Sequence, residues 1–371
     1  MARNIQDRTP VQSDRLEEIR ARYTRPSFLV QLALLALLAA LPFVIPSFRV
    51  MDVVVKIMIF TVVVASFDLI LGYTGILSFA HGMFFGLGAY SMALITYHSG
   101  TPQWYHFPLA VLLTLFLSVA VALLISFFSL RIKAIFFAFM TLALAEFGHI
   151  LGYQWSGLTM GEDGISFKMP GIFDVNWSGG TFLGTDLNGR LVTYYLILAV
   201  SVLLFLGLVR FVRSPLGRVL KAIRANEPRA VALGYKTFHY QTFSIVFGSS
   251  VSALAGVLFA MWLRYVNPDS VLGTALMLNI LLMCVIGGLG TLYGGIIGAA
   301  FITVTQAWLP DLQKATVALF PHAEIIHRLA ERWILYFGIL FILVVFFFPK
   351  GIIGTIRDSA RQRRRAALSK D

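Results

Sequence analysis

The sequence has little of what a soluble enzyme or a disulfide-stabilised domain needs. Only 13% of its 371 residues are charged, and its single cysteine, Cys284, lies in an apolar run. One cysteine cannot form a disulfide within the chain, and without a histidine beside it makes a poor metal site. The sequence also lacks a Walker A phosphate loop, zinc-ligand spacing and a GxSxG nucleophile motif. It therefore predicts no catalytic residue, no metal site and no cofactor in this chain.

Apolar residues dominate instead. They make up 58% of the chain, and the mean hydropathy of +0.80 is far above that of a soluble domain. A run of about 20 apolar residues is long enough to cross a membrane as a helix. The fold class predicted is an all-α, polytopic integral membrane protein with about ten transmembrane helices, at residues 27–45, 50–71, 72–97, 106–128, 134–153, 191–209, 238–263, 271–288, 292–308 and 333–348.

The basic residues predict an orientation. The formal net charge is +12, and lysine and arginine gather in cytoplasmic loops of membrane proteins. The loop with Arg131 and Lys133, the segment 210–237 and the basic tail 349–371 fall on one side of the predicted membrane. The slightly acidic, glycine-rich loop 154–190 falls on the other side. We therefore expect both termini in the cytoplasm, with loop 154–190 external.

These segments divide the chain. A transmembrane domain covers residues 27–348, between a polar N-terminal segment at 1–26 and the basic tail at 349–371. The N-terminal segment has no apolar core or cleavage signature, so we expect no cleaved signal peptide. It is equally consistent with an amphipathic helix on the membrane surface and with a disordered tail.

The longest strongly polar stretch between two apolar runs is Arg210–Lys236. Seven of its residues are basic, and only Glu227 opposes them. Charge alone favours an ordinary basic loop that holds the topology. Nucleic-acid binding is disfavoured, because no soluble fold presents this stretch. The alternative is a docking platform for a cytoplasmic partner.

Capping signals in this stretch predict two short helices. Ser214-Pro215 is a typical helix start. Glu227 precedes a proline and is expected outside the α region, so residues 226–228 predict a second cap or turn. A short helix at 230–233 should then end at Gly234.

The segment 72–90 combines glycines with polar side chains. Gly82 and Gly86 form a GxxxG pair, which allows two helices to pack closely in lipid. Residues 72–75 could also interrupt the helix, and polar groups at membrane depth usually face protein or a cavity. Close packing and a position along a pathway both stay open. His81 could hydrogen-bond a neighbouring helix or contact a substrate.

Other intramembrane residues predict packing and pairing. Gly290, Gly294 and Gly298 recur every fourth residue, which predicts one helix face that packs closely. Asp52 and Lys56 are four residues apart and could neutralise each other, in a span that also carries Asp68. Glu146 and His149 could relay protons, but such residues more often pair with each other.

Five stretches taken together resemble a known family. They are GYTGILSFAHGMFFGLGAY (72–90), LTMGEDGI (158–165), SPLGRVLKAIRANEPRAVALGY (214–235), MLNILLMCVIGGLGTLYGGIIGA (277–299) and FFPKGIIG (347–354). In this order they resemble the M-type (LivM-like) permeases of branched-chain amino-acid ABC importers. The resemblance covers about residues 50–354.

The resemblance implies a transport subunit and not an enzyme. It implies a bacterial inner-membrane complex with a second, H-type permease, two cytoplasmic ATPase subunits that bind ATP and Mg, and a periplasmic binding protein. Its lipid-embedded core would translocate branched-chain or related hydrophobic amino acids, although similar importers carry urea, amides or aromatic acids. An ion-coupled secondary transporter is the competing class. That class favours paired ionisable residues in mid-membrane, and this chain has few.

The resemblance also implies site residues. Those expected to couple to an ATPase are Ala222, Arg224, Ala225, Asn226, Glu227, Arg229, Ala230, Leu233 and Gly234. The small alanines would allow close docking, and Arg224 and Arg229 would pair with carboxylates of the partner. The residues expected along the translocation path are Gly72, Tyr73, Gly75, Ser78, His81, Gly82, Phe85, Gly86 and Tyr90.

Overall fold

The computed structural model describes residues 26–45, 47–129, 134–174, 177–182, 185–319, 333–349 and 351–355. Nearly all of the predicted N-terminal segment and most of the basic tail lie outside this part of the chain, as do Arg131 and Lys133. The long helices are α2 (Pro26–Val44), α3 (Phe48–Asp68), α4 (His81–His98), α5 (His106–Ser129), α6 (Ala134–Gln154), α8 (Gly189–Arg213), α11 (Thr237–Leu263), α13 (Thr274–Gly287), α14 (Leu292–Leu319) and α16 (Trp333–Phe347).

Short elements connect them. The π-helical turn η1 (Leu69–Thr74) continues α3, and the helices α9 (Pro215–Ala225) and α10 (Glu227–Ala232) follow α8. The others are α7 (Ser156–Thr159), α12 (Pro268–Val271), the 3₁₀ turns η2 (Gly161–Asp163) and η3 (Gly171–Phe173), and the strands β1 (Ile165–Ser166), β2 (Ser178–Phe182), β3 (Thr185–Asn188) and β4 (Tyr265–Val266).

Eight helices in the described part of the chain are long and apolar enough to cross a membrane. The chain is therefore a multi-pass, all-α membrane protein. The two other predicted spans correspond to α2 and α4. In α2 the apolar helix covers only Gln31–Val44, which is shorter than a membrane span. Helix α4 is rich in glycine and carries histidines and tyrosines, which lower its hydropathy. The count of ten and the cytoplasmic termini stay predictions.

Helices α3 and α11 form the centre of the molecule. Helix α11 packs against α3, α4 and α5, and α3 also packs against α8, α13 and α14. Both central helices are mostly buried, whereas α5, α6 and α16 are mostly exposed. The exposed side chains include large apolar ones, such as Phe116, which is 70% exposed. An apolar outer surface of this kind suits lipid or another apolar chain.

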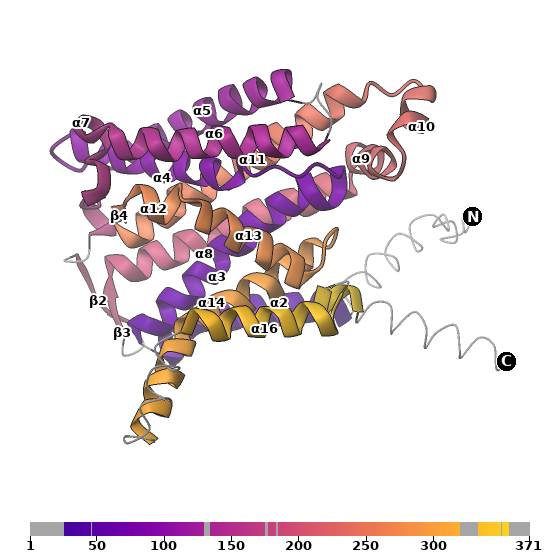
Figure 1. The fold of residues 1–371 in the computed structure, drawn as a ribbon. Coiled ribbons are helices and arrows are strands. Elements are labelled where there is room, and N and C mark those ends of the chain that lie inside the picture. Colours follow the sequence, from indigo (N-terminus) through magenta and orange to yellow (C-terminus); the bar gives the residue numbers. More distant parts are fainter. Residues whose placement is uncertain are drawn as a thin grey trace, which may run out of the picture.

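The two ends of the helix bundle differ. Helices α9 and α10 lie at one end, which we call the hairpin end, and α7, β2, β3 and β4 lie at the opposite loop end (Figure 1). At the loop end, β1 pairs antiparallel with β4, so that Ile165 lies opposite Val266. Strand β2 pairs with β3 in the same way. The basic segment 210–237 and the acidic loop 154–190 are thus at opposite ends of the bundle.

Candidate functional site

The hairpin between α8 and α11 consists of two capped helices. The Ser214 side-chain oxygen accepts a hydrogen bond from the backbone N–H of Gly217 at the start of α9. The Asn226 side-chain oxygen accepts one from the N–H of Arg229 at 3.0 Å, at the start of α10. Each cap satisfies a backbone donor that the first turn of a helix leaves unpaired.

The second helix starts earlier than the sequence predicts. Glu227 was expected outside the helix, but it is the first residue of α10, and Pro228 is the second. Asn226 takes the extended conformation, with φ −162° and ψ 98°. Its capping bond outweighs the preference of a residue before proline for extended backbone. Gly234 follows the helix with φ +87°, a conformation that glycine adopts readily.

The hairpin has an inward and an outward face. Leu220, Ile223 and Ala230 are buried against the rest of the chain. The outward face exposes 54% of Val231 and 71% of Leu233. The side chain of Ala230 is covered by its own chain, so its predicted role in docking stays a prediction that the exposed residues of the hairpin support better. The other predicted coupling residues Ala222, Ala225, Asn226, Glu227, Arg229 and Gly234 are exposed.

Two basic side chains of α9 reach back to the end of the long helix α3. The Arg224 Nη1 atom donates a hydrogen bond to the backbone carbonyl of Gly72. The Lys221 Nζ atom lies 5.0 Å from the centre of the Tyr73 ring. A cation is favoured here, because the last carbonyls of a helix are partly negative. The predicted pairing of Arg224 with a partner stays a prediction, and within the chain one of its nitrogens is already bonded to Gly72.

The carbonyl of Gly72 belongs to the π-helical turn η1. In such a turn, hydrogen bonds span five residues, and single π turns are frequent at functional sites. Thr74 Oγ1 lies 2.8 Å from Ser244 Oγ of α11, which fastens the turn to the central helix. Gly75 then ends the helix with φ +83°, and the chain is non-helical until α4. The predicted interruption at 72–75 therefore begins later, at Gly75.

A buried carboxylate completes this region. Asp68 is 1% exposed, and its Oδ1 atom accepts a hydrogen bond from the backbone N–H of Gly290 at 2.6 Å. The thiol of Cys284 also donates to it at 3.7 Å. A Cβ atom at Gly72 would lie 1.9 Å from Asp68 Oδ1 and 2.4 Å from the Gly290 nitrogen. Only glycine at position 72 therefore allows the carboxylate to reach Gly290.

Four segments meet at this point, which we call the coupling node: η1 with Gly72, α3 with Asp68, the turn before α14 with Gly290, and α9 with Arg224. The sequence predicted Gly72, Gly290 and Arg224 separately, with different roles, and gave Asp68 no role. The available signal was a carboxylate in an apolar span, four residues before a glycine. Such a residue usually has a partner inside the protein.

A cavity of about 490 Å³ lies beside the coupling node. Residues 74–77, the hairpin residues 223–228, Phe137 and Gln241 line it. The Gln241 side-chain amide donates to the Glu227 carboxylate at 3.2 Å, which links α11 to α10. The hairpin is therefore joined to the bundle partly through polar contacts beside open space.

The residues predicted along a translocation path lie mostly inside the chain. Of that set, only Gly75 is exposed, and the others are buried. His81 Nε2 lies 2.9 Å from Ser66 Oγ of α3, which agrees with the interpretation of His81 as a partner of a neighbouring helix. The role of these residues in a path stays a prediction.

The glycines of α4 face two different helices. A Cβ atom at Gly82 would make an ordinary contact with Met277 of α13, whereas one at Gly86 would lie 2.2 Å from Leu272 Cδ2. The closest approach is at Gly88, where a Cβ atom would lie 1.7 Å from the Ala253 carbonyl oxygen of α11. Glycine thus lets α4 approach the backbone of α11.

The predicted glycine face of residues 290–298 needs a correction. Gly290 does not lie on α14; it has φ +79° in the turn before that helix. Its positive φ and its bond to Asp68 place it in the coupling node. A Cβ atom added at Gly294 would lie 2.5 Å from the carbonyl oxygen of Gly287. One added at Gly298 would lie 1.8 Å from the carbonyl oxygen of Met283. These two glycines allow α14 to pack against α13.

Two predicted side-chain pairs are confirmed. Lys56 Nζ lies 2.8 Å from Asp52 Oδ2, one helical turn apart. The His149 ring lies 3.5 Å from Glu146, and its Nε2 atom lies 2.9 Å from Asp269 Oδ1. The second pair is therefore bonded to residues of its own chain near α12, as expected for intramembrane polar residues.

Comparison with known proteins identifies a family for the chain. Residues 49–348 match the family described as the branched-chain amino acid transport system permease component. The LivM permease proteins of high-affinity branched-chain amino acid transport in Salmonella typhimurium and Escherichia coli are each 27% identical to the chain. The alignments cover 89% and 90% of this chain and 76% and 77% of those proteins.

A second type of relative matches over a shorter range. The LivH permease protein of Escherichia coli is 26% identical over 42% of this chain and 49% of its own length. No solved structure matches the chain. The family match spans most of the chain and includes the coupling node and the hairpin. The chain therefore belongs to the family of permease components of branched-chain amino acid transport systems.

Proposed function

We propose that the chain is a permease subunit of an ATP-driven importer in a bacterial inner membrane. It translocates branched-chain or related hydrophobic amino acids that a periplasmic binding protein delivers. The names of its relatives support the substrate. The proposed transmission of energy from the ATPases rests on one observation, the hydrogen bond from Arg224 of the hairpin to the Gly72 carbonyl at the end of α3.

The sequence and the relatives support two kinds of partner, ATPase subunits and a second permease. Its sequence has no phosphate-binding loop, so ATP and Mg would be bound by separate ATPase subunits. Two such subunits would dock at the hairpin end. The partial match to LivH supports a second permease of related sequence beside this one. The exposed apolar surfaces of α5, α6 and α16 would face lipid or that second permease.

The outward face of the hairpin fits a docking role. Exposed Val231 and Leu233 supply apolar contact area, and the exposed Arg229 can pair with a carboxylate of the ATPase. A loop that only held the topology would need the positive charge but no capped helices. The two side-chain caps instead give the hairpin a defined shape.

The coupling node would pass motion of the hairpin into the membrane domain. A displacement of α9 pulls on Gly72 through Arg224 and on Tyr73 through Lys221. Asp68, one turn before Gly72, is bonded to Gly290 and so links α3 to the turn between α13 and α14. Packed elements with two discrete arrangements can transmit such a change. The buried residues of segment 72–90 would then border the path when these helices separate.

Reconstitution tests this function. We would co-express the chain with the H-type permease and the ATPases, purify the complex and measure leucine uptake into proteoliposomes with the binding protein. The expected result is copurification of the ATPases and uptake that requires ATP. Uptake by the chain alone, driven by an ion gradient, would contradict the proposal. Competition by urea, an amide or an aromatic acid would separate the substrate alternatives.

A further inference from the structure

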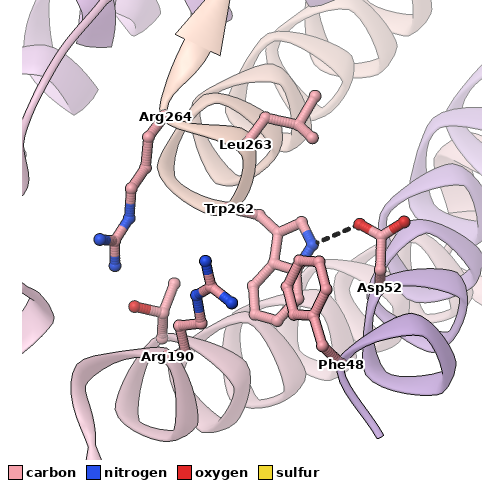
Figure 2. A pocket seen from close by; sticks show the side chains of 7 residues that line it. Phe48, Asp52, Arg190, Trp262, Leu263 and Arg264 are labelled. Carbon is pink, nitrogen blue, oxygen red and sulfur yellow. Dashed lines mark hydrogen bonds between the residues drawn. The ribbon is translucent and has the colours of Figure 1, made fainter. Parts of the chain in front are cut away.

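A small pocket lies at the loop end, far from the coupling node. It has a volume of about 90 Å³ and is formed where α3 and α8 begin and where α11 ends. Its lining residues are Phe48, Asp52, Arg190, Thr193, Trp262, Leu263 and Arg264 (Figure 2). None of them belongs to the predicted coupling or path residues.

The chain holds both arginines of this pocket in place. The Arg264 Nη2 atom donates to the backbone carbonyl of Phe173 at 2.6 Å. The guanidinium carbon of Arg190 lies 4.3 Å from the centre of the Phe48 ring. Arg264 also has φ +59°, a left-handed conformation that is uncommon for a residue other than glycine and is frequent at binding sites. Both guanidiniums are therefore positioned before any ligand binds.

The charges around the pocket leave an excess of positive charge. Burial and the neighbouring Arg190 lower the pKa of Arg264, whereas Asp174 raises it. Asp52 accepts hydrogen bonds from the Trp262 indole and from Lys56, at 2.8 Å each. The charged groups are thus Arg190, Arg264 and Lys56 against Asp52 and Asp174, a sum of +1.

The geometry and the helix dipole favour an anion. In Figure 2, Arg190 and Arg264 lie on one side of Trp262, and Asp52 lies on the other. Arg190 is the second residue of α8, where the partly positive helix end repels a cation and attracts an anion. One water needs about 10–15 Å³, so the pocket has room for a group of a few atoms, such as a carboxylate.

We propose that this pocket binds a carboxylate group between the guanidiniums of Arg190 and Arg264. Arginine can hold a carboxylate through two parallel hydrogen bonds, a geometry that lysine cannot reproduce. The source of the carboxylate rests on the proposed importer function. It is either the free amino acid that enters from the loop end or an acidic side chain of the binding protein.

The test compares Arg190→Gln, Arg190→Lys and Arg264→Gln with Arg49→Gln in the purified complex. Arg49 is a matched control, because it lies at the loop end next to the pocket residue Phe48 but pairs with Asp311 outside the pocket. One arm measures binding of L-leucine, of L-leucinamide, which lacks the carboxylate, and of sodium acetate on its own. The other arm measures the affinity of the complex for the leucine-loaded binding protein.

Loss of a charge-assisted hydrogen bond should weaken carboxylate binding roughly ten-fold or more in the two glutamine variants. Arg190→Lys, which keeps the charge and the fold, should also bind more weakly than the Arg49→Gln control. A change in leucine binding, absent for leucinamide, identifies the amino acid as the source. A change in binding-protein affinity alone identifies the side chain.

Equal affinities of all variants and the control in both arms would overturn the proposal. A failure of the importer function gives a different result. In that case the wild-type complex would not require ATP for uptake or bind the binding protein, but acetate would still distinguish Arg190→Gln from Arg49→Gln.

Discussion

Arginine serves different purposes at the two ends of helix α3. At the hairpin end, Arg224 is bonded to the Gly72 carbonyl of its own chain, beside the bond between Asp68 and Gly290. At the loop end, Arg190 and Arg264 line a pocket that has room for a small anion. The first arrangement ties a surface helix to the core, whereas the second leaves guanidinium donors facing a space that a ligand can fill.

One continuous helix connects these two ends. Helix α3 with its π-helical turn runs over 27 residues, from Phe48 to Thr74, or about 40 Å. Its sides are packed against α8, α11, α13 and α14. Rigid secondary elements can carry coupling between distant sites, so we expect a displacement at the coupling node to reach the loop end through α3. The predictions below alter each end in turn.

The largest effect is expected for Gly72→Ala. The new Cβ atom would lie 1.9 Å from Asp68 Oδ1 and 2.4 Å from the Gly290 nitrogen, so the hydrogen bond between them cannot persist. Overpacking costs about 1–3 kcal/mol or more, in addition to the lost bond. The midpoint of thermal unfolding in detergent should fall clearly. Gly207→Ala in α8 is the control, because a Cβ atom there meets open space. Equal melting of the two variants would contradict the close approach.

The next effect is expected for Asp68→Leu. It leaves the partly buried N–H of Gly290 without its acceptor, which costs about 1–3 kcal/mol. Asp68→Asn keeps an oxygen at this place and should retain more of the stability. Thermal unfolding of both variants is the measurement. A leucine variant as stable as the asparagine variant would show that the hydrogen bond contributes little.

Gly234→Leu should have a smaller effect on stability and a specific effect on docking. Gly234 has φ +87°, which costs a leucine roughly 1–2 kcal/mol, and a Cβ atom there meets no other atom. The hairpin should change shape while the chain still inserts and keeps its charge. We expect a reduced yield of copurified ATPase. A normal yield together with normal ATP-dependent uptake would favour the simple basic loop.

The smallest effect is expected at the loop end, for Trp262→Phe. Phenylalanine keeps the ring that stacks on Phe48 but removes the hydrogen bond to Asp52. A hydrogen bond between membrane helices is worth about 1 kcal/mol. The unfolding midpoint should shift by a few degrees at most. A shift as large as that of Gly72→Ala would mean that the loop end is packed as tightly as the coupling node.

Features set by spacing along one helix could be predicted from the sequence. The pair of Asp52 and Lys56 depends only on residues one turn apart, and the apolar runs give the helices. The cap at Ser214 is equally local.

The coupling node and the pocket depend on contacts between distant segments. Asp68 and Gly290 are 222 positions apart, and Gly72 and Arg224 are 152 positions apart. Neither periodicity nor charge predicts which distant backbone groups a side chain meets. Gly290 was misplaced on a helix for this reason: its spacing from Gly294 fits a helix, but its positive φ belongs to a turn. Arg190 and Arg264 likewise come together only through the packing of α8 against α11.

The most direct test of the coupling node is the ratio of ATP hydrolysed to amino acid taken up by the reconstituted complex. We would compare Arg224→Ala with Arg229→Ala, since both remove one charge from the hairpin but only Arg224 is bonded to Gly72. Arg224→Ala should retain its ATPase subunits and hydrolyse ATP while uptake falls about ten-fold, so that the ratio rises. Arg229→Ala should lower hydrolysis and uptake together, at an unchanged ratio. A wild-type ratio for Arg224→Ala would contradict the role of the coupling node in transmission.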